Sequence, residues 1–206
     1  MKLHRAVGDR ASEAHVLTDL SELALWQGQD ALALAHARAA LDIAESVQAR
    51  LWQLFALRSL DNAELALGRF AAAAAAFERA HALSIALDNA GWLDAAAGRA
   101  QVALAQGDVP AALSHLQGLL THLAGGGTLK GTEWPRTVQF TCYRVLAQAS
   151  DPRAADFLAA AHTDLQARAA TILDAALRQS FLCHIPVHRA IVAAWAAQLA
   201  PTDTPR

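Results

Sequence analysis

The sequence predicts an all-α protein, a right-handed superhelical solenoid of antiparallel helix pairs with about ten helices in all. Three observations predict this fold class. Of the 206 residues, 52 are Ala and 31 are Leu, which are strong helix formers. Only 11 residues are Gly and six are Pro, so few residues break helices. Finally, Gly28, Gly68 and Gly107 lie 40 and 39 residues apart, a spacing typical of stacked repeats.

The residues around these glycines repeat with them. A Leu lies three residues before each glycine, and matched residues lie five, nine and twelve residues after it. The matched sets are Leu25, Leu65 and Leu104; Ala33, Ala73 and Ala112; Ala37, Phe77 and Leu116; and Ala40, Ala80 and Leu119. Residues of one set are expected to be equivalent neighbours in the stack. A degenerate fourth copy follows if Ser150 takes the glycine position, which aligns Ala147, Ala155 and Ala159 with the earlier sets.

Each glycine predicts the turn inside a helix pair, because a residue that tolerates positive φ ends one helix and a capping residue begins the next. Asp30, Asp108 and Asp151 are the expected caps, and Pro110 and Pro152 are expected in first turns. The expected helices cover residues 10–27, 30–47, 49–67, 70–88, 90–106, 109–124, 134–149, 152–172 and 174–183, and a last helix begins at Pro186 with Ile191 and Trp195 facing inward.

The second helix of each pair is apolar on most of its surface. Between residues 30 and 46 the charged residues Arg38, Asp42 and Glu45 fall on one strip. In the next second helix, the alanine tract 71–76 would let neighbouring backbones approach closely while Phe77 fills the space between them. Helices of this kind are covered on most sides, as in a stack.

We expect two parts of one continuous solenoid. Residues 1–124 would hold three helix pairs after a partial repeat, because the stretch from His4 resembles the end of a second helix without its first helix. Residues 125–206 would hold the degenerate fourth pair and C-terminal capping helices, with the Gly-rich segment 125–132 as a flexible connection. If the chain is a fragment of a larger protein, its end helices would expose apolar faces, and self-association through them is a further expectation.

Charge and composition argue against several partners. The chain has 17 basic and 19 acidic residues, and no Lys and Arg cluster could neutralise a run of phosphates, so no nucleic-acid partner is expected. The longest unbroken apolar run, 70–77, is far shorter than the ~20 residues of a membrane span. Cys142 and Cys183 are expected to be free buried thiols of a reducing compartment, which fits the cytoplasm.

The sequence favours a protein without catalytic activity, cofactor or metal. It has no Gly-x-Ser-x-Gly turn, no Walker-type loop and no Cys-x-x-Cys pair. His184 and His188 have the spacing nearest to a ligand pair, but Pro186 should begin a helix and leave His184 outside it. An unrecognised helical enzyme is kept as an alternative.

The repeat resembles the tetratricopeptide repeat, in which a turn Gly is followed by a small Ala, a large apolar residue and a second Ala. The resemblance covers roughly residues 8–123, and the period is about 40 residues, as in the long-repeat type, instead of 34. Ser21, Asp61 and Ala100 occupy the position of a small residue in the middle of the first helices. The later segments 131–136, 141–146, 151–154 and 180–189 resemble the C-terminal repeat arrays of large bacterial signalling ATPases and transcriptional regulators.

This resemblance implies a non-catalytic protein-protein interaction or sensor module of a larger bacterial signalling or transcription-regulatory protein. It implies that the first helices line a concave groove that binds a peptide or protein segment. The groove residues by the family's convention are His15, Glu22, Trp26, Phe55, Arg58, Asn62, Asp94, Gln101, Phe140 and Arg144. Arg58 and Asn62 match two positions with which some members hold a terminal carboxylate, although Ala97 occupies the next basic position.

Two questions stay open at this point. A small-molecule or peptide-pheromone receptor, whose solenoid closes on its ligand, is the alternative function. Among the five tryptophans, Trp52, Trp92 and Trp195 are expected in the core, whereas Trp26 and Trp134 are candidates for the surface.

Overall fold

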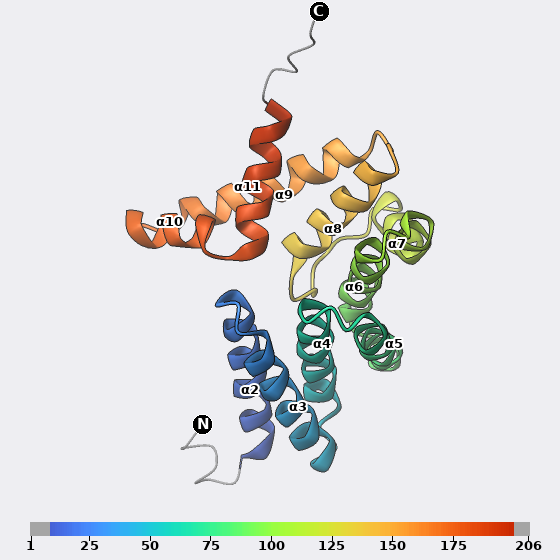
Figure 1. Cartoon of the computed structure of the whole chain (residues 1–206), viewed down its shortest axis with the longest axis vertical. Helices are drawn as coiled ribbons and strands as arrows, with labels where there is room; N and C mark the ends of the chain where they lie inside the picture. The colour runs from blue at the N-terminus through green and yellow to red at the C-terminus, as the bar shows by residue number, and fades with distance from the viewer. Residues whose placement is uncertain (1–8, 200–206) are drawn as a thin grey trace, which may run out of the picture. The chain divides into compact units, whose positions relative to one another are not determined.

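The regular structure of this protein is entirely helical. The computed structural model describes residues 9–199, and within that range it contains ten α-helices and no strand (Figure 1). The helices are α2 (Arg10–Trp26), α3 (Asp30–Ser46), α4 (Arg50–Ala66), α5 (Phe70–Ala86), α6 (Gly91–Ala105), α7 (Val109–Ala124), α8 (Pro135–Gln148), α9 (Ala154–Ala170), α10 (Ala175–Cys183) and α11 (Pro186–Leu199). The predicted all-α solenoid of helix pairs is confirmed. None of the described helices is both long and apolar enough to cross a membrane.

The chain forms two compact units, Met1–Glu133 and Trp134–Arg206. The N-terminal unit contains α2 to α7, and the C-terminal unit contains α8 to α11. Residues 125–133, which we expected to belong to the C-terminal part, lie in the N-terminal unit instead. The partial repeat expected around His4 lies outside the described residues.

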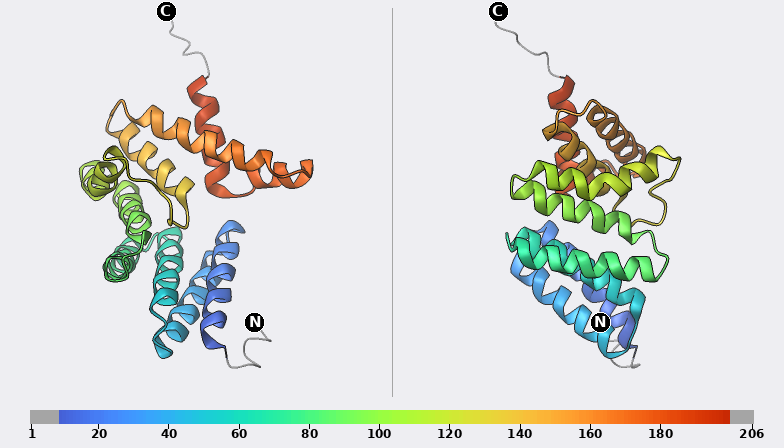
Figure 2. Two further views of the ribbon diagram at one scale, coloured as in Figure 1. Left: turned by 180° about the vertical axis from the view of Figure 1, so that it is seen from behind. Right: turned by 90° about the vertical axis from the view of Figure 1, so that its right-hand side faces the viewer.

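Helices of the N-terminal unit pack in the order of the sequence, each against the next one (Figures 1 and 2). The first helices of the pairs also contact one another, α2 with α4 and α4 with α6, whereas the second helices α3, α5 and α7 touch one another less. The first helices are therefore the more closely spaced layer. We call their solvent side the inner face of the unit, because a stack curves toward its more closely spaced layer.

The turns within the pairs have the geometry that the glycines predict. Gly28, Gly68 and Gly107 have φ angles of 70°, 69° and 78°. In each turn the N–H of the following residue donates to the carbonyl five residues back, at 2.8 to 2.9 Å, which ends the first helix. Ser150 adopts the same conformation with a φ of 55°. The expected turn at Ser150 is therefore present without a glycine.

The capping predictions are confirmed at one of three positions. Asp108 accepts a hydrogen bond from the N–H of Ala111 at 2.9 Å, and Pro110 lies in the first turn of α7. Asp30 is instead the first residue of α3, after Gln29. Asp151 accepts from the N–H of Arg153, and α9 begins only at Ala154, so the predicted cap and the first-turn position of Pro152 are both wrong.

The matched columns form the core of the N-terminal unit. The residues five, nine and twelve positions after each turn glycine are all between 0% and 3% exposed. The column 33, 73 and 112 consists of Ala alone, which lets adjacent helix axes approach closely. Gly98 of α6 completes this packing, because a Cβ atom at this position would collide with the Phe77 ring of α5. The aromatic ring therefore fills space that a neighbouring helix leaves by having no side chain.

The degenerate fourth pair keeps the turn but not the columns. Ala155 is exposed and Ala159 half-buried, whereas Ala154, Leu158 and Ala161 are buried. The buried face is displaced by one residue from the predicted register. The helix α9 also begins four residues after Ser150, whereas α3, α5 and α7 each begin two residues after their turn glycine.

The C-terminal unit packs α8, α9, α10 and α11 around one apolar cluster. Its fully buried members include Leu158, Leu165 and Ile191, and Trp195 packs against them. The last helix begins at Pro186, as predicted, and Ile191 is 0% exposed. By contrast, α10 has no buried residue.

We expect Gly98→Ala to destabilise the protein, because the added methyl group must displace Phe77 in a fully packed core. The expected loss in the free energy of unfolding is about 1 to 3 kcal/mol. Gly118→Ala on α7 is the matched control, since nothing lies within 4 Å of its Cβ position, and it should stabilise by up to about 1 kcal/mol. Urea unfolding followed by far-UV circular dichroism measures both, and equal stability of the two variants would contradict the packing at Gly98.

Candidate functional site

Equivalent residues of the first helices form three rows across the inner face of the N-terminal unit. The rows contain the residues 13, ten and six positions before each turn glycine. They are His15, Phe55 and Asp94; Thr18, Arg58 and Ala97; and Glu22, Asn62 and Gln101. Because α4 contacts both α2 and α6, each row crosses three neighbouring helices. The repeat thus brings six of the predicted groove residues, in addition to Arg58 and Asp94, onto one layer or its edge: His15, Glu22, Trp26, Phe55, Asn62 and Gln101.

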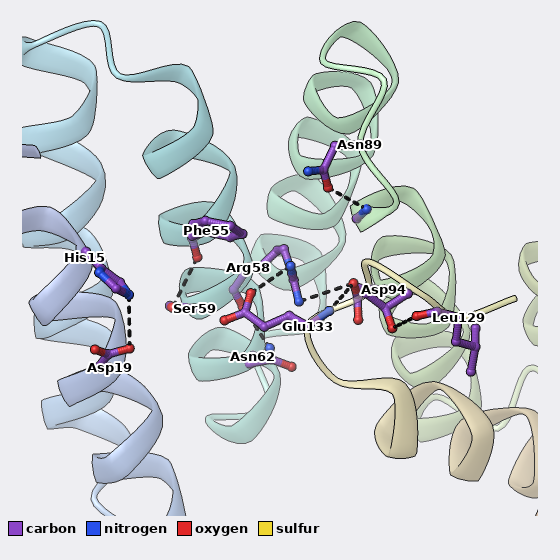
Figure 3. A network of polar contacts seen from close by, with 12 residues as sticks. His15, Asp19, Phe55, Arg58, Ser59, Asn62, Asn89, Asp94, Leu129 and Glu133 are labelled. Atoms are coloured by element: carbon purple, nitrogen blue, oxygen red, sulfur yellow. Dashed lines mark hydrogen bonds and ion pairs between the residues drawn. The ribbon is translucent and has the colours of Figure 1, made fainter. Parts of the chain in front are cut away.

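Arg58 is the centre of a polar network on this face (Figure 3). Its side chain is 2% exposed, and its guanidinium lies 2.8 Å from a Glu133 carboxylate oxygen and 3.3 Å from an Asp94 oxygen. The backbone N–H of Glu133 donates to the same Asp94 oxygen at 3.2 Å. The Phe55 ring centre lies 6.0 Å from the guanidinium carbon, within reach of a cation-π contact. We call Arg58, Asp61, Asp94 and Glu133 the buried charge cluster.

Glu133 reaches Arg58 because the segment 125–133, which we call the strap, is anchored along its length. The His122 ring nitrogen lies 3.2 Å from the Thr128 carbonyl, and a Cβ atom at Gly127 would collide with that ring. Gly131, with a φ of 90°, lies close enough to α6 that its Cβ position is 3.2 Å from the Ala90 side chain. The expected flexible connection is therefore an anchored segment of the N-terminal unit.

The strap changes how much of the inner face is open. Along the first row, His15 is exposed, Phe55 is half-buried and Asp94 is only 7% exposed. At the α6 end of the row, Asp94 accepts the backbone N–H of Glu133, whereas the Glu133 carboxylate lies on Arg58 of α4. Arg58 and Asp94, predicted to line an open groove, are thus buried beside the strap.

The α2 end of the inner face carries stacked rings. His15 stacks on Trp52 with ring centres 4.4 Å apart, and Trp52 lies 5.4 Å from Phe55. The sequence prediction placed Trp52 in the core, and it does pack against the core cluster while its ring stays half-buried. Trp26, at the end of α2, is 43% exposed. Glu22, Asn62 and Gln101 are half-buried.

Two predicted groove residues belong to the C-terminal unit. Phe140 packs against its apolar cluster and has Tyr143 at 5.5 Å between ring centres, which is a core position. Arg144 is exposed. Glu133 was not among the predicted groove residues, and no repeat pattern identifies it, because it lies in a connection outside the register.

Asp61 is the buried carboxyl of α4 in the column of Ser21 and Ala100. The Ser21 hydroxyl donates to the Ala33 carbonyl at 2.9 Å, so this column faces the second helix of the pair. Asp61 is 0% exposed, and neither of its carboxyl oxygens accepts a hydrogen bond of good geometry from the described residues. Burial raises the pKa of Asp61 well above its ordinary value, while the nearby Arg58 charge opposes the shift.

The same helix carries a second buried acid that is compensated differently. Glu64 is 4% exposed, and its carboxylate lies 2.9 Å from the Arg38 guanidinium of α3 and 3.4 Å from that of Arg69. Two cations thus satisfy Glu64, whereas Asp61 shares Arg58 with Asp94 and Glu133. Burial also raises the pKa of Glu133, and the neighbouring Asp94 charge adds to the shift that Arg58 opposes.

His188 and His184 of the C-terminal unit both pair with groups of the protein. His188 is 5% exposed, with one ring nitrogen 2.8 Å from the Phe181 carbonyl and the other 3.2 Å from the Arg136 guanidinium. Burial lowers the pKa of His188, and His184 pairs with the Ser180 hydroxyl instead. Among residues 9–199, no group of three or more His, Cys, Asp or Glu side chains could hold a metal ion.

The two cysteines differ in environment. Cys142 is fully buried, and burial raises the pKa of its thiol to about 12, so the thiolate does not form at neutral pH. Cys183 is half-buried and also free.

No model of a known protein family matches the chain, and no curated protein sequence matches it significantly.

We expect Asp61→Ser to stabilise the protein at neutral pH, by about 1 to 3 kcal/mol, because it replaces a buried carboxyl with the residue type of the first repeat. Since the folded-state pKa of Asp61 is raised, its neutral form stabilises the fold below the ordinary pKa, and this contribution is lost as the pH rises through the folded-state pKa. The advantage of the variant should therefore grow from about pH 4 toward neutral pH.

Urea unfolding at a series of pH values measures this advantage. Asp42→Ser on the exposed side of α3 is the control and should show no such trend. An advantage of Asp61→Ser that shrinks with rising pH would mean that Asp61 is ionised and stabilising in the folded protein.

Proposed function

We propose that the N-terminal unit is a non-catalytic protein-interaction module that binds a peptide or protein segment across its inner face. The observation that carries this proposal is the set of three rows at equivalent positions of α2, α4 and α6. Aromatic rings, amides and a buried cation gather there on one layer. A partner that crosses several repeats can contact the same row on each helix, which is how solenoids use their concave surfaces.

The inner face combines two kinds of contact. The rings of His15, Trp52 and Phe55 offer flat surfaces that a partner can bury, and each is exposed or half-buried. The half-buried amides of Asn62 and Gln101 can exchange hydrogen bonds with an extended backbone. Aromatic groups beside amide groups are characteristic of peptide-recognition surfaces.

The scaffold we propose is a long-repeat tetratricopeptide-like solenoid. It would serve in the cytoplasm as the interaction or sensor part of a larger bacterial signalling or transcription-regulatory protein. The support is the register of turn glycines, buried Ala columns and a first-helix layer, together with the motif resemblance described for residues 131–189.

The test is selection of binders from a random-peptide display library on the full chain. Selected peptides should share a sequence pattern and should bind at least about tenfold more weakly to Asn62→Ala and to His15→Ala, a loss typical of a well-placed interface side chain. Fluorescence polarisation measures the affinities, and a melting curve for each variant shows that it is folded.

Asp42→Ala, on the second-helix layer, is the matched control and should bind like the parent. Peptides that lose affinity for the control but not for the two inner-face variants would place binding elsewhere. Failure to enrich any common pattern would also count against the proposal.

A further inference from the structure

The strap returns to the unit from which it starts. It leaves the end of α7, passes Ala90 at the beginning of α6, and brings Glu133 to Arg58 of α4 (Figure 3). Between these anchors the strap also has internal hydrogen bonds, such as that from the Thr132 hydroxyl to the Leu129 carbonyl at 2.7 Å. The polar contacts of Glu133 with Arg58 and Asp94 therefore hold this end of the strap against the inner face.

Glu133 pairs with Arg58 as a glutamate of a bound peptide would. Its carboxylate lies 2.8 Å from the Arg58 guanidinium, and its backbone N–H donates a hydrogen bond to Asp94 at 3.2 Å. Main-chain and side-chain recognition of one residue by two helices is the pattern expected for a ligand in an extended conformation. Here the chain supplies that residue itself.

Of the three side chains in this contact, the most exposed one is the one that a partner can replace. The side chain of Glu133 is 39% exposed, whereas those of Arg58 and Asp94 are 2% and 5% exposed. Glu133 is thus the outer layer of the buried charge cluster and is accessible to solvent. The adjacent Asp94 carboxylate repels the Glu133 carboxylate and Arg58 attracts it, while the Glu133 backbone N–H donates to Asp94.

We propose that the strap is an internal occupant of the binding face, in which Glu133 takes the position of a glutamate of an acidic peptide partner. This inference rests on the proposed function of the inner face. A partner glutamate that offers its N–H to Asp94 and its carboxylate to Arg58 displaces Glu133. The strap then leaves α6, and the α6 end of the inner face opens.

Lys130 provides a direct measure of strap opening. It is exposed within the strap, and Lys130 and Lys2 are the two lysines of the chain, so a lysine-specific endoprotease has a single cleavage site beyond residue 2. Cleavage after Lys130 tracks the population of the open strap when opening is fast. Glu133→Gln removes the charge but keeps the size of the side chain, and we expect cleavage to accelerate by about tenfold, the usual effect of losing one charge-assisted hydrogen bond.

Glu78→Gln is the matched control for this experiment. Glu78 also pairs with an arginine, at 2.9 Å from Arg99, and lies 57% exposed on α5, away from the strap. Its variant should be cleaved after Lys130 at the rate of the parent. Equal cleavage rates in Glu133→Gln and Glu78→Gln would overturn the inference.

A second experiment adds the strap segment as a separate peptide. The probe is a capped peptide of residues 128–133 that carries the Lys130→Ala change, so that the protease does not cut it. It should bind Glu133→Gln at least about tenfold more tightly than the parent, because the parent site is already filled. In the parent, saturating peptide should accelerate cleavage after Lys130.

The same peptide with the additional Glu133→Gln change should neither bind the Glu133→Gln protein more tightly than the parent nor accelerate cleavage of the parent. Equal affinity of the acidic peptide for the parent and for Glu133→Gln would mean that it binds elsewhere, and the internal-occupant inference would fail. Library-selected peptides that depend on His15 and Asn62 but leave cleavage after Lys130 unchanged would refute the strap inference alone and would leave the proposed function standing.

Discussion

The close approach of helix backbones at the alanine column of residues 33, 73 and 112 is the constraint on which the rest of the structure depends. Ala33, Ala73 and Ala112 are fully buried at equivalent positions, so each second helix lies close against its neighbours. Where Phe77 enters this layer, Gly98 on the facing helix makes room for it. A larger side chain at Ala33, Ala73 or Ala112 would push neighbouring helices apart, and the rows of the inner face would lose their alignment.

The stack buries the charge of Arg58, and this charge brings the polar groups of the site together. The equivalent residues Thr18 and Ala97 carry no charge, so the second repeat alone places a cation at this position of the inner face. A buried guanidinium needs carboxylate partners. α6 provides Asp94, and the strap provides Glu133, so a feature of one repeat draws in a segment that lies far along the chain. The electrostatic requirement of Arg58 explains why a Gly-rich connection is held in one place.

The sequence predicted the turns within the helix pairs and the start of the last helix, but it missed two of the three caps and the contacts of the strap. Turn glycines, the cap at Asp108 and the beginning of α11 at Pro186 depend on residues within a few positions of one another, and they are present. Asp30 is not the cap of α3, because it is the first residue of the helix and Gln29 takes the cap position. A sequence pattern alone does not locate a helix end to one residue. Glu133 carried no signal at all, since its role depends on a partner 75 positions earlier.

The sequence by itself determined the helical class, the pairing of helices and the residues that share a row, because these follow from a period that recurs about every 40 residues. Only the tertiary structure decided which members of a row stay open. Arg58 and Asp94 were predicted as groove residues by their register, yet they are buried, because the strap crosses the α6 end of the face. Register specifies the direction of a side chain from its own helix. Exposure also depends on segments outside the repeat, and their path is set by charge pairing and contact that no periodic pattern encodes.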